Sequence, residues 1–118
     1  MNIIAVDDET LALNSLIRVL KQVFVDMDIK GFQKSCEALQ LIDALSQKGE
    51  KLDYAFLDVE MRGISGIELA KRIKEICPET RILFVSAYDH YACEAFQIHA
   101  KGYILKPATK ELIEESLE

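Results

Sequence analysis

Short, mainly apolar segments alternate along this chain with longer segments of helical periodicity, and this alternation limits the fold more than any other feature. Five segments rich in β-branched or aromatic residues are predicted to be strands, namely 2–6, 28–32, 54–57, 81–85 and 102–105. Apolar residues recur every three or four positions in the segments between and after them, which predicts helices at 10–24, 35–48, 67–77, 89–98 and 110–117. In the fourth of these helices, Ala92, Ala95 and Phe96 are predicted to face inward. The chain is therefore predicted to contain five successive strand–helix units.

Strands that are apolar on both faces are typical of parallel sheets that helices cover on each side. The right-handed rule for crossovers leaves few strand orders, and the flavodoxin-like order is the common one for five strands. A length of 118 residues fits a single domain. We predict an α/β (βα)5 flavodoxin-like three-layer sandwich, with a parallel five-stranded sheet in the order 2-1-3-4-5, as one domain over residues 1–118.

The charge balance restricts the partners of this domain. The chain carries 14 Lys and Arg residues against 20 Asp and Glu residues, a formal net charge of −6. Binding to a nucleic-acid backbone needs a basic surface, so we expect this domain not to bind DNA or RNA by itself. We also predict a cytoplasmic protein without membrane contact, because the sequence has no signal-peptide pattern and no membrane-length apolar stretch.

Cysteine and histidine residues suggest no separate site. The three cysteines, Cys36, Cys77 and Cys93, form no CxxC pair, which argues against a disulfide framework or a zinc site. Each falls in a predicted helix, so we expect each to be buried as a small apolar residue in a reducing cytosol. His90 and His99 are expected on the solvated surface, distant from the acidic residues described next.

Polar residues follow four of the predicted strands at their carboxyl ends, where open parallel sheets bind their ligands. They are Asp7, Asp8 and Glu9 after the first strand, Asp58 and Glu60 after the third, Ser86 after the fourth, and Lys106 with Pro107 after the fifth. Two carboxylates about 4 Å apart repel by roughly 4 kcal/mol at an effective dielectric of 20. A fold that gathers several of them therefore implies a compensating cation.

Each of these residues, taken alone, also has an ordinary explanation. Asp8 or Thr10 could cap the first helix, and Asp58 could end its strand as a turn former. Ser86 could cap the fourth helix, and Lys106 could be one of many solvated lysines. Their convergence on one edge of the sheet favours a common site instead.

The chemistry that these groups suit is phosphoryl transfer to a carboxylate. Oxygen ligands without His or Cys favour a hard cation, and Mg2+ fits better than Ca2+ because it shares its ligand shell with phosphoryl groups and no twelve-residue calcium loop is present. Lys106 offers a mobile charge for carboxylate or phosphoryl oxygens. Ser86 offers a hydroxyl donor.

The pattern of Asp7-Asp8, Asp58, Ser86 and Lys106-Pro107 resembles the receiver domains of two-component response regulators, over essentially the whole chain. Residues 56–66 (FLDVEMRGISG) are similar to the phosphoacceptor strand and turn of that family. Residues 88–107 (YDHYACEAFQIHAKGYILKP) are similar to receivers fused to LytTR-type DNA-binding domains.

The resemblance implies a role for each acidic residue. Asp58 would be the phosphoacceptor. Asp8 and Asp58 would bind Mg2+ directly together with the backbone carbonyl of Glu60, and Asp7 would act through a water molecule.

It also implies roles at the ends of the last two strands. Ser86 and Lys106 would hold the phosphoryl group, and Pro107 would follow a cis peptide bond. Tyr103 would be the aromatic switch residue, which turns inward when the Ser86 hydroxyl moves toward the phosphoryl group. The alternative for Tyr103 is an ordinary amphipathic aromatic on an edge strand.

Two positions depart from the family pattern. Arg62 stands where proline is usual, which removes a rigid φ but no functional atom, and Gly102 stands where many relatives have aspartate. The resemblance also implies that Glu60 and Tyr88 are at positions that, in this family, flank the acceptor pocket and influence the lifetime of the acyl phosphate. We expect the Glu60 charge to alter attack by water.

The predicted function is signal relay rather than enzymatic turnover. A sensor histidine kinase would phosphorylate Asp58, and the face formed by helix 4, strand 5 and helix 5 would then repack, forming a homodimer or contacting an output domain. The last helix stops after about two turns at Glu118, and the resemblance of residues 88–107 to LytTR-type receivers implies an output domain. We therefore expect a missing output domain that binds DNA and controls transcription. The alternatives are a stand-alone receiver that acts by protein–protein interaction, a module that keeps the pocket unused, and an aspartyl-nucleophile Mg2+ phosphatase. The phosphatase is disfavoured because Asp7 and Asp8 are adjacent rather than in a DxD arrangement.

Overall fold

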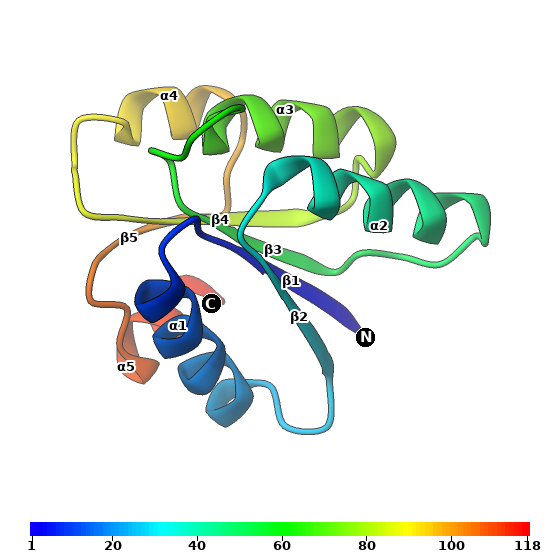
Figure 1. Cartoon of the computed structure of the whole chain (residues 1–118). Helices are drawn as coiled ribbons and strands as arrows, with labels where there is room; N and C mark the ends of the chain where they lie inside the picture. The colour runs from blue at the N-terminus through cyan, green and yellow to red at the C-terminus, as the bar shows by residue number, and fades with distance from the viewer.

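The computed structural model describes all 118 residues and shows five strands and five helices in strict alternation (Figure 1). The strands are β1 (Asn2–Val6), β2 (Asp28–Phe32), β3 (Tyr54–Leu57), β4 (Arg81–Ser86) and β5 (Gly102–Leu105). The helices are α1 (Thr10–Val23), α2 (Ser35–Gln47), α3 (Gly66–Ile76), α4 (Ala92–Gln97) and α5 (Lys110–Ser116). All pairings are parallel, in the order β2-β1-β3-β4-β5, so the predicted fold and strand order are confirmed.

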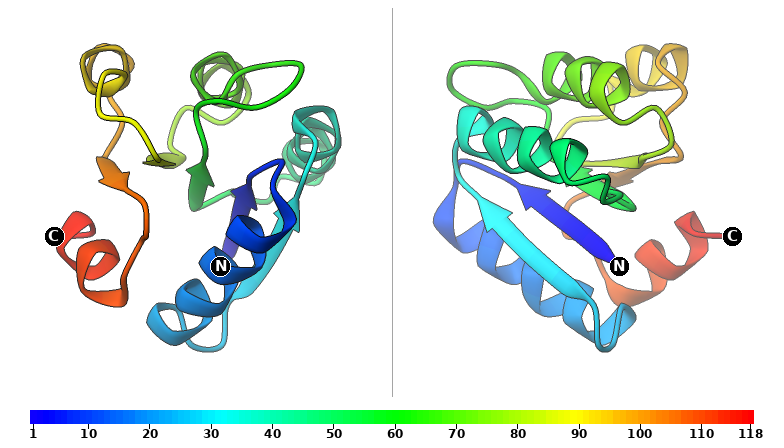
Figure 2. Two further views of the ribbon diagram at one scale, coloured as in Figure 1. Left: turned by 60° about the vertical axis from the view of Figure 1, so that its left-hand side comes forward. Right: turned by 90° about the vertical axis from the view of Figure 1, so that its right-hand side faces the viewer.

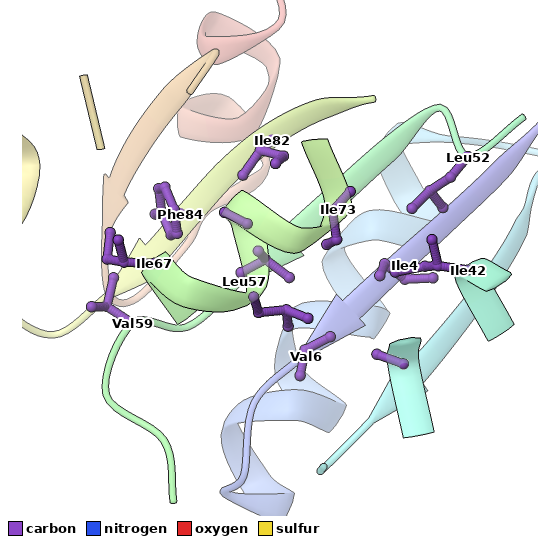
Figure 3. Packing of buried hydrophobic residues seen from close by; sticks show 14 of the residues in the cluster. Ile4, Val6, Ile42, Leu52, Leu57, Val59, Ile67, Ile73, Ile82 and Phe84 are labelled. Carbon is purple, nitrogen blue, oxygen red and sulfur yellow. The ribbon is translucent and has the colours of Figure 1, made fainter. Parts of the chain in front are cut away.

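Helices cover both faces of the sheet. In Figures 1 and 2, α1 and α5 lie on one side, and α2, α3 and α4 lie on the other. Side chains alternate between these layers along each strand. In β1, Ile4 and Val6 join the core under α2 and α3, whereas Ile3 and Ala5 join the core under α1. Figure 3 shows the first of these clusters, and the double coverage explains why the central strands are apolar on both faces.

Strand register brings the ends of the central strands to one level. Val6 of β1 pairs with Leu57 of β3, so Asp7 and Asp58, the next residues of each strand, come side by side. The last residue of β4, Ser86, pairs with the last residue of β5, which directly precedes Lys106. The sheet therefore delivers residues from distant parts of the sequence to a single edge. None of the helices is long and apolar enough to cross a membrane.

The fourth helix is shorter than predicted, and two of its predicted core residues are on the surface. The sequence suggested residues 89–98, whereas α4 spans Ala92–Gln97. Ala95 is buried, but Ala92 is exposed and Phe96 is 81% exposed, although both were expected to face inward. A helix of fewer than two turns presents little more than one residue to the sheet, and Ala95 occupies that position.

The burial predicted for the cysteines is wrong for Cys36 and Cys93 and is partly confirmed for Cys77. Cys36 and Cys93 are exposed, and Cys77 is half-buried just beyond the end of α3. Cys36 and Cys93 each lie two residues before a buried alanine, Ala38 and Ala95 respectively. Residues two apart lie on opposite sides of a helix, so both cysteines point outward. His90 and His99 are exposed, as predicted.

Candidate functional site

Lys106 lies between two buried carboxylates at the carboxyl edge of the sheet. Its Nζ is 2.9 Å from Oδ2 of Asp7 and 3.4 Å from Oδ2 of Asp58. The two aspartates are only 2% and 6% exposed, so these charges interact with little screening by water. Lys106 is thus a paired residue of the site rather than a solvated lysine.

Backbone donors hold the other oxygen of each carboxylate. The N–H of Val59 donates to Oδ1 of Asp58 at 2.8 Å, and the N–H of Glu9 donates to Oδ1 of Asp7 at 3.0 Å. Each side chain therefore has one oxygen fixed by the chain and one oxygen directed at Lys106. This arrangement restricts the orientation of both carboxylates.

Asp8 completes an acidic cluster from the other side. Its Oδ2 accepts a hydrogen bond from the N–H of Arg62 at 2.9 Å and lies 3.5 Å from Nε of the same residue. Oxygen atoms of Asp7, Asp8 and Asp58 all lie within 4.8 Å of one another. The N-cap of α1 is Glu9 without a side-chain cap bond, so the capping alternative for Asp8 is wrong.

The charge balance of this cluster is incomplete. Burial and the neighbouring charge of Asp7 raise the pKa of Asp58 from 3.8 to about 6, against the lowering effects of Lys106 and the Val59 N–H. Burial lowers the pKa of Lys106, but the hydrogen bond from Lys106 to Asp7 and the negative charge of Asp58 outweigh it, and the pKa is raised overall. One ammonium and one guanidinium group face three carboxylates, so the acidic cluster keeps uncompensated negative charge, and a bound divalent cation would relieve it.

An open depression of about 580 Å³ adjoins Asp8. Glu60, Arg62 and Tyr91 are among its lining residues, so Glu60 and Asp8 open onto the same depression. The carboxylate of Glu60 also affects Tyr91, whose pKa is raised first by burial and then by that charge. Glu60 and the residue that precedes α4 thus line the same depression.

Ser86 is connected to β5 through two hydrogen bonds. Its fully buried hydroxyl oxygen accepts the N–H of Tyr88 at 3.1 Å, and the carbonyl of Tyr88 accepts the hydroxyl of Tyr103. The ring of the half-buried Tyr103 lies 6.2 Å from that of Phe84. Ser86 does not cap α4, whose N-cap is Tyr91. The sequence singled out both ends of this path but missed the backbone of Tyr88, because a main-chain group leaves no side-chain signal.

The turn after Asp58 packs directly against the backbone of the site. At Gly66, a Cβ atom would lie 1.8 Å from the carbonyl oxygen of Asp58. The N–H of Gly66 also donates to the carbonyl of Val59 at 2.9 Å. The sequence indicated Gly66 only as a turn residue, whereas the structure shows that it is required for this close approach. At the other side of the site, the peptide bond between Lys106 and Pro107 is cis.

Comparison with known proteins supports a single family. The family model described as "Response regulator receiver domain" matches residues 3–118. The chain is 36% identical over 119 residues to the "Sensory transduction protein LytT" of Bacillus subtilis (strain 168), covering 100% of this chain and 47% of that protein. It is 35% identical over 118 residues to the "Transcriptional regulatory protein LytR" of Staphylococcus aureus (strain N315), covering 99% and 46%. The chain thus spans about half the length of these relatives.

A solved structure shares the same architecture. It is a response regulator protein from Burkholderia pseudomallei with a phosphorylated aspartic acid, a calcium ion and citrate. It superposes with a TM-score of 0.83 at 27% identity, over 99% of this chain and 66% of that chain. The family match over almost the whole sequence, the relatives of more than one-third identity and the fold agree that this chain belongs to the response regulator receiver domain family, whose members act in phosphorelay signalling.

Proposed function

We propose that this domain accepts a phosphoryl group on Asp58 from the phosphohistidine of a sensor kinase, in a reaction that depends on Mg2+. The observation that supports this proposal most directly is the position of Asp58, a buried carboxylate beside Lys106, which it shares with Asp7, with one oxygen held by the N–H of Val59. A carboxylate in this setting is oriented by the chain and lies next to a cation. Both properties favour a nucleophile in phosphoryl transfer.

The transfer itself balances simply. An oxygen of the Asp58 carboxylate attacks phosphorus, and the new O–P bond forms as the P–N bond of the donor breaks. The imidazole nitrogen of the donor keeps the electron pair and takes up a proton. Lys106, already 3.4 Å from Asp58, is placed to neutralise charge on the phosphoryl oxygens. Attack of water on the phosphorus of the acyl phosphate would later restore the carboxylate.

The donor set fits a hard divalent cation. Asp8, Asp58 and the backbone carbonyl of Glu60 would hold Mg2+ directly, and Asp7 would act through water. All donors are oxygen atoms, and the uncompensated charge of the three aspartates gives a physical reason for a cation. Mg2+ would offset negative charge on the phosphoryl oxygens during transfer. The calcium ion in the related Burkholderia structure is a divalent cation of the same hard class.

The hydrogen bonds between Ser86 and Tyr103 support a switch that leads away from Asp58. A phosphoryl group on Asp58 would attract the Ser86 hydroxyl and disturb its bond with the N–H of Tyr88. Tyr103, which donates to the carbonyl of Tyr88, would respond in turn. The affected face contains α4, β5 and α5, where Phe96 and Leu105 are exposed. These apolar groups suit contact with a second copy or with an output domain.

The names of the relatives favour control of transcription as the output. The LytR relative is described as a transcriptional regulatory protein, and this chain covers 46% of it. In a protein of that organisation, the part outside the receiver would bind DNA, which agrees with the acidic charge of this chain. Such a phosphorelay would operate in the cytoplasm, which is the location that we propose. A receiver that acts by protein contact alone is the alternative.

Intact-mass spectrometry tests the phosphoacceptor. Incubation with acetyl phosphate and Mg2+ should add the mass of one phosphoryl group to the wild-type chain, and EDTA should prevent the addition. Asp58→Asn should show no addition, whereas Asp43→Asn, at an exposed aspartate of α2, should react like the wild type. An unmodified wild type, or a phosphorylated Asp58→Asn protein, would contradict the proposal.

The switch needs a separate measurement. Tyr103→Phe removes the hydroxyl that donates to Tyr88 but keeps the ring against Phe84. We expect phosphorylation at the wild-type level, with smaller amide shift changes in α4 and β5 when the NMR spectra of the free and phosphorylated proteins are compared. Equal shift changes in Tyr103→Phe and wild type would exclude this path.

A further inference from the structure

Arg62 makes two contacts with the same carboxylate oxygen of Asp8. Its backbone N–H donates to Oδ2 at 2.9 Å, and its Nε lies 3.5 Å from that atom. The side chain of Asp8 is only 17% exposed, whereas that of Arg62 is 91% exposed. A solvent-exposed side chain therefore reaches a mostly buried carboxylate from the solvent side.

The acidic cluster is divided between two cations that differ in burial. Lys106 pairs with Asp7 and Asp58 from the interior, and its side chain is 23% exposed. Asp8 is within ion-pair distance of Arg62 but not of Lys106. Asp8, the most exposed carboxylate of the cluster, is thus the one whose cationic partner is itself on the surface.

We propose that Arg62 competes with the divalent cation for Asp8 and thereby lowers the cation affinity of the phosphoacceptor site. This inference rests on the proposed function. In the metal-free protein, the guanidinium partly neutralises Asp8 and keeps it beside Asp7 and Asp58. A cation bound through Asp8 Oδ2 would displace the guanidinium or share the oxygen with it. A proline at this position would offer neither an N–H nor a charge, so it could not compete for Asp8 in this way.

The size of the effect follows from the exposure of Arg62. Ion pairs of exposed side chains are weak, and removing one such competitor should tighten cation binding by about two- to five-fold. Salt should reduce the difference, because dissolved ions screen an exposed charge within about 10 Å at 0.1 M. Arg62 therefore adjusts the affinity of the site without blocking it.

Isothermal titration calorimetry with MgCl2 tests this inference without any phosphoryl transfer. Arg62→Gln removes the guanidinium but keeps the backbone N–H. Arg72→Gln is the matched control, because Arg72 is an exposed arginine of α3 with its own surface ion pair, 3.8 Å from Glu68. Both variants change the net charge equally. We expect a Kd for Mg2+ about two- to five-fold lower in Arg62→Gln at low salt, and little change in Arg72→Gln.

The outcomes separate this inference from the proposed function. The role of Arg62 is overturned if the Kd of Arg62→Gln for Mg2+ is equal to or higher than that of the wild type. It is also overturned if Arg72→Gln changes the Kd by the same factor. Either result leaves the phosphoacceptor site intact. Absence of Mg2+ binding in both the wild type and Arg62→Gln overturns the proposed function as well. Chemical unfolding in EDTA provides the structural control, and the two arginine variants should match the wild type in it.

Discussion

The carboxyl edge of β1, β3 and β5 and the segment around α4 lie next to each other but are held in different ways. At the sheet edge, Asp7 and Asp58 are buried, and each of their oxygens has a donor or a cation. In α4, only Ala95 is buried, and the helix begins at an N-cap residue without a side-chain cap bond. The reactive groups are thus fixed by the core, whereas the neighbouring helix has few buried contacts.

This difference suggests that the buried sheet edge carries out the reaction and that the segment around α4 changes in response to it. Groups that react must keep their geometry, and burial in a packed sheet provides that constraint. A segment that reports the reaction must change at low cost, and short helices with little buried surface open or shift most easily. The hydrogen bonds from Ser86 through Tyr88 to Tyr103 join the end of β4 to β5 by way of the segment that leads into α4. Substitutions in each region test whether the sheet edge is held more firmly than α4.

The largest expected effect is in the core beneath the site. Phe84 of β4 is fully buried, and Phe84→Ala should lower the free energy of unfolding by about 3–5 kcal/mol, because it removes buried apolar surface and leaves a cavity. Urea denaturation in EDTA, followed by circular dichroism, measures this loss. A loss below about 1 kcal/mol would mean that the sheet repacks freely, and the contrast with α4 would fail.

The turn after Asp58 should be almost as sensitive. In Gly66→Ala, the new methyl group would overlap the carbonyl oxygen of Asp58, so we expect about 3 kcal/mol of destabilisation and slower phosphorylation by acetyl phosphate. Gly63→Ala is the comparison, since nothing lies within 4 Å of its added Cβ and only its φ of 79° opposes the change. That variant should lose about 1 kcal/mol. Equal losses would show that contact with Asp58 is not the cause.

A smaller and opposite effect is expected from neutralising the phosphoacceptor. The pKa of Asp58 is raised to about 6, so the folded protein binds this proton more tightly than the unfolded chain does. The stability that the residue contributes is therefore full below pH about 4 and is lost as the pH rises to about 6. Asn cannot ionise, so Asp58→Asn should exceed the wild type by about 1–2 kcal/mol at pH 7.5 in EDTA.

Urea unfolding between pH 4 and pH 8 checks this sign. The advantage of Asp58→Asn should be absent near pH 4, grow between pH 4 and pH 6, and remain constant above that range. Asp43→Asn, at an exposed position of α2, should follow the wild type. A wild type that is more stable than Asp58→Asn at pH 7.5 would contradict the raised pKa.

The sequence predicted the buried sheet and its edge more accurately than it predicted the segment around α4. The apolar runs of β1, β3 and β4 predicted a doubly covered parallel sheet, because burial on both faces leaves a direct pattern in the sequence. The strand ends then predicted which polar residues meet, and Asp7, Asp58 and Lys106 do so. These residues could be placed because the carboxyl ends of parallel strands lie at one edge of the sheet.

Prediction was weaker where a helix is short or a main-chain group is involved. Periodicity assigned Phe96 to the core, but six residues are too few for a periodic pattern to define a face. The contacts of Arg62 with Asp8 depend on the path of the turn, and its backbone N–H has no sequence signature. The same applies to the N–H and carbonyl of Tyr88, which depend on loop geometry.

The smallest expected effect is at Phe96, and it provides the sharpest counterpart to Phe84. The same substitution, Phe96→Ala, removes a side chain that is 81% exposed, so it should change the free energy of unfolding by no more than about 0.5 kcal/mol in the urea assay. Phosphorylation of Asp58 should also be unaffected, because α4 contributes no group to the acidic cluster. If the exposed ring contacts a second copy of the chain, Phe96→Ala should weaken dimerisation of the phosphorylated protein, which analytical sedimentation measures. A loss of stability above about 1 kcal/mol would show that α4 is held as firmly as the sheet, and the proposed division between a fixed reactive edge and a responsive helix would then be wrong.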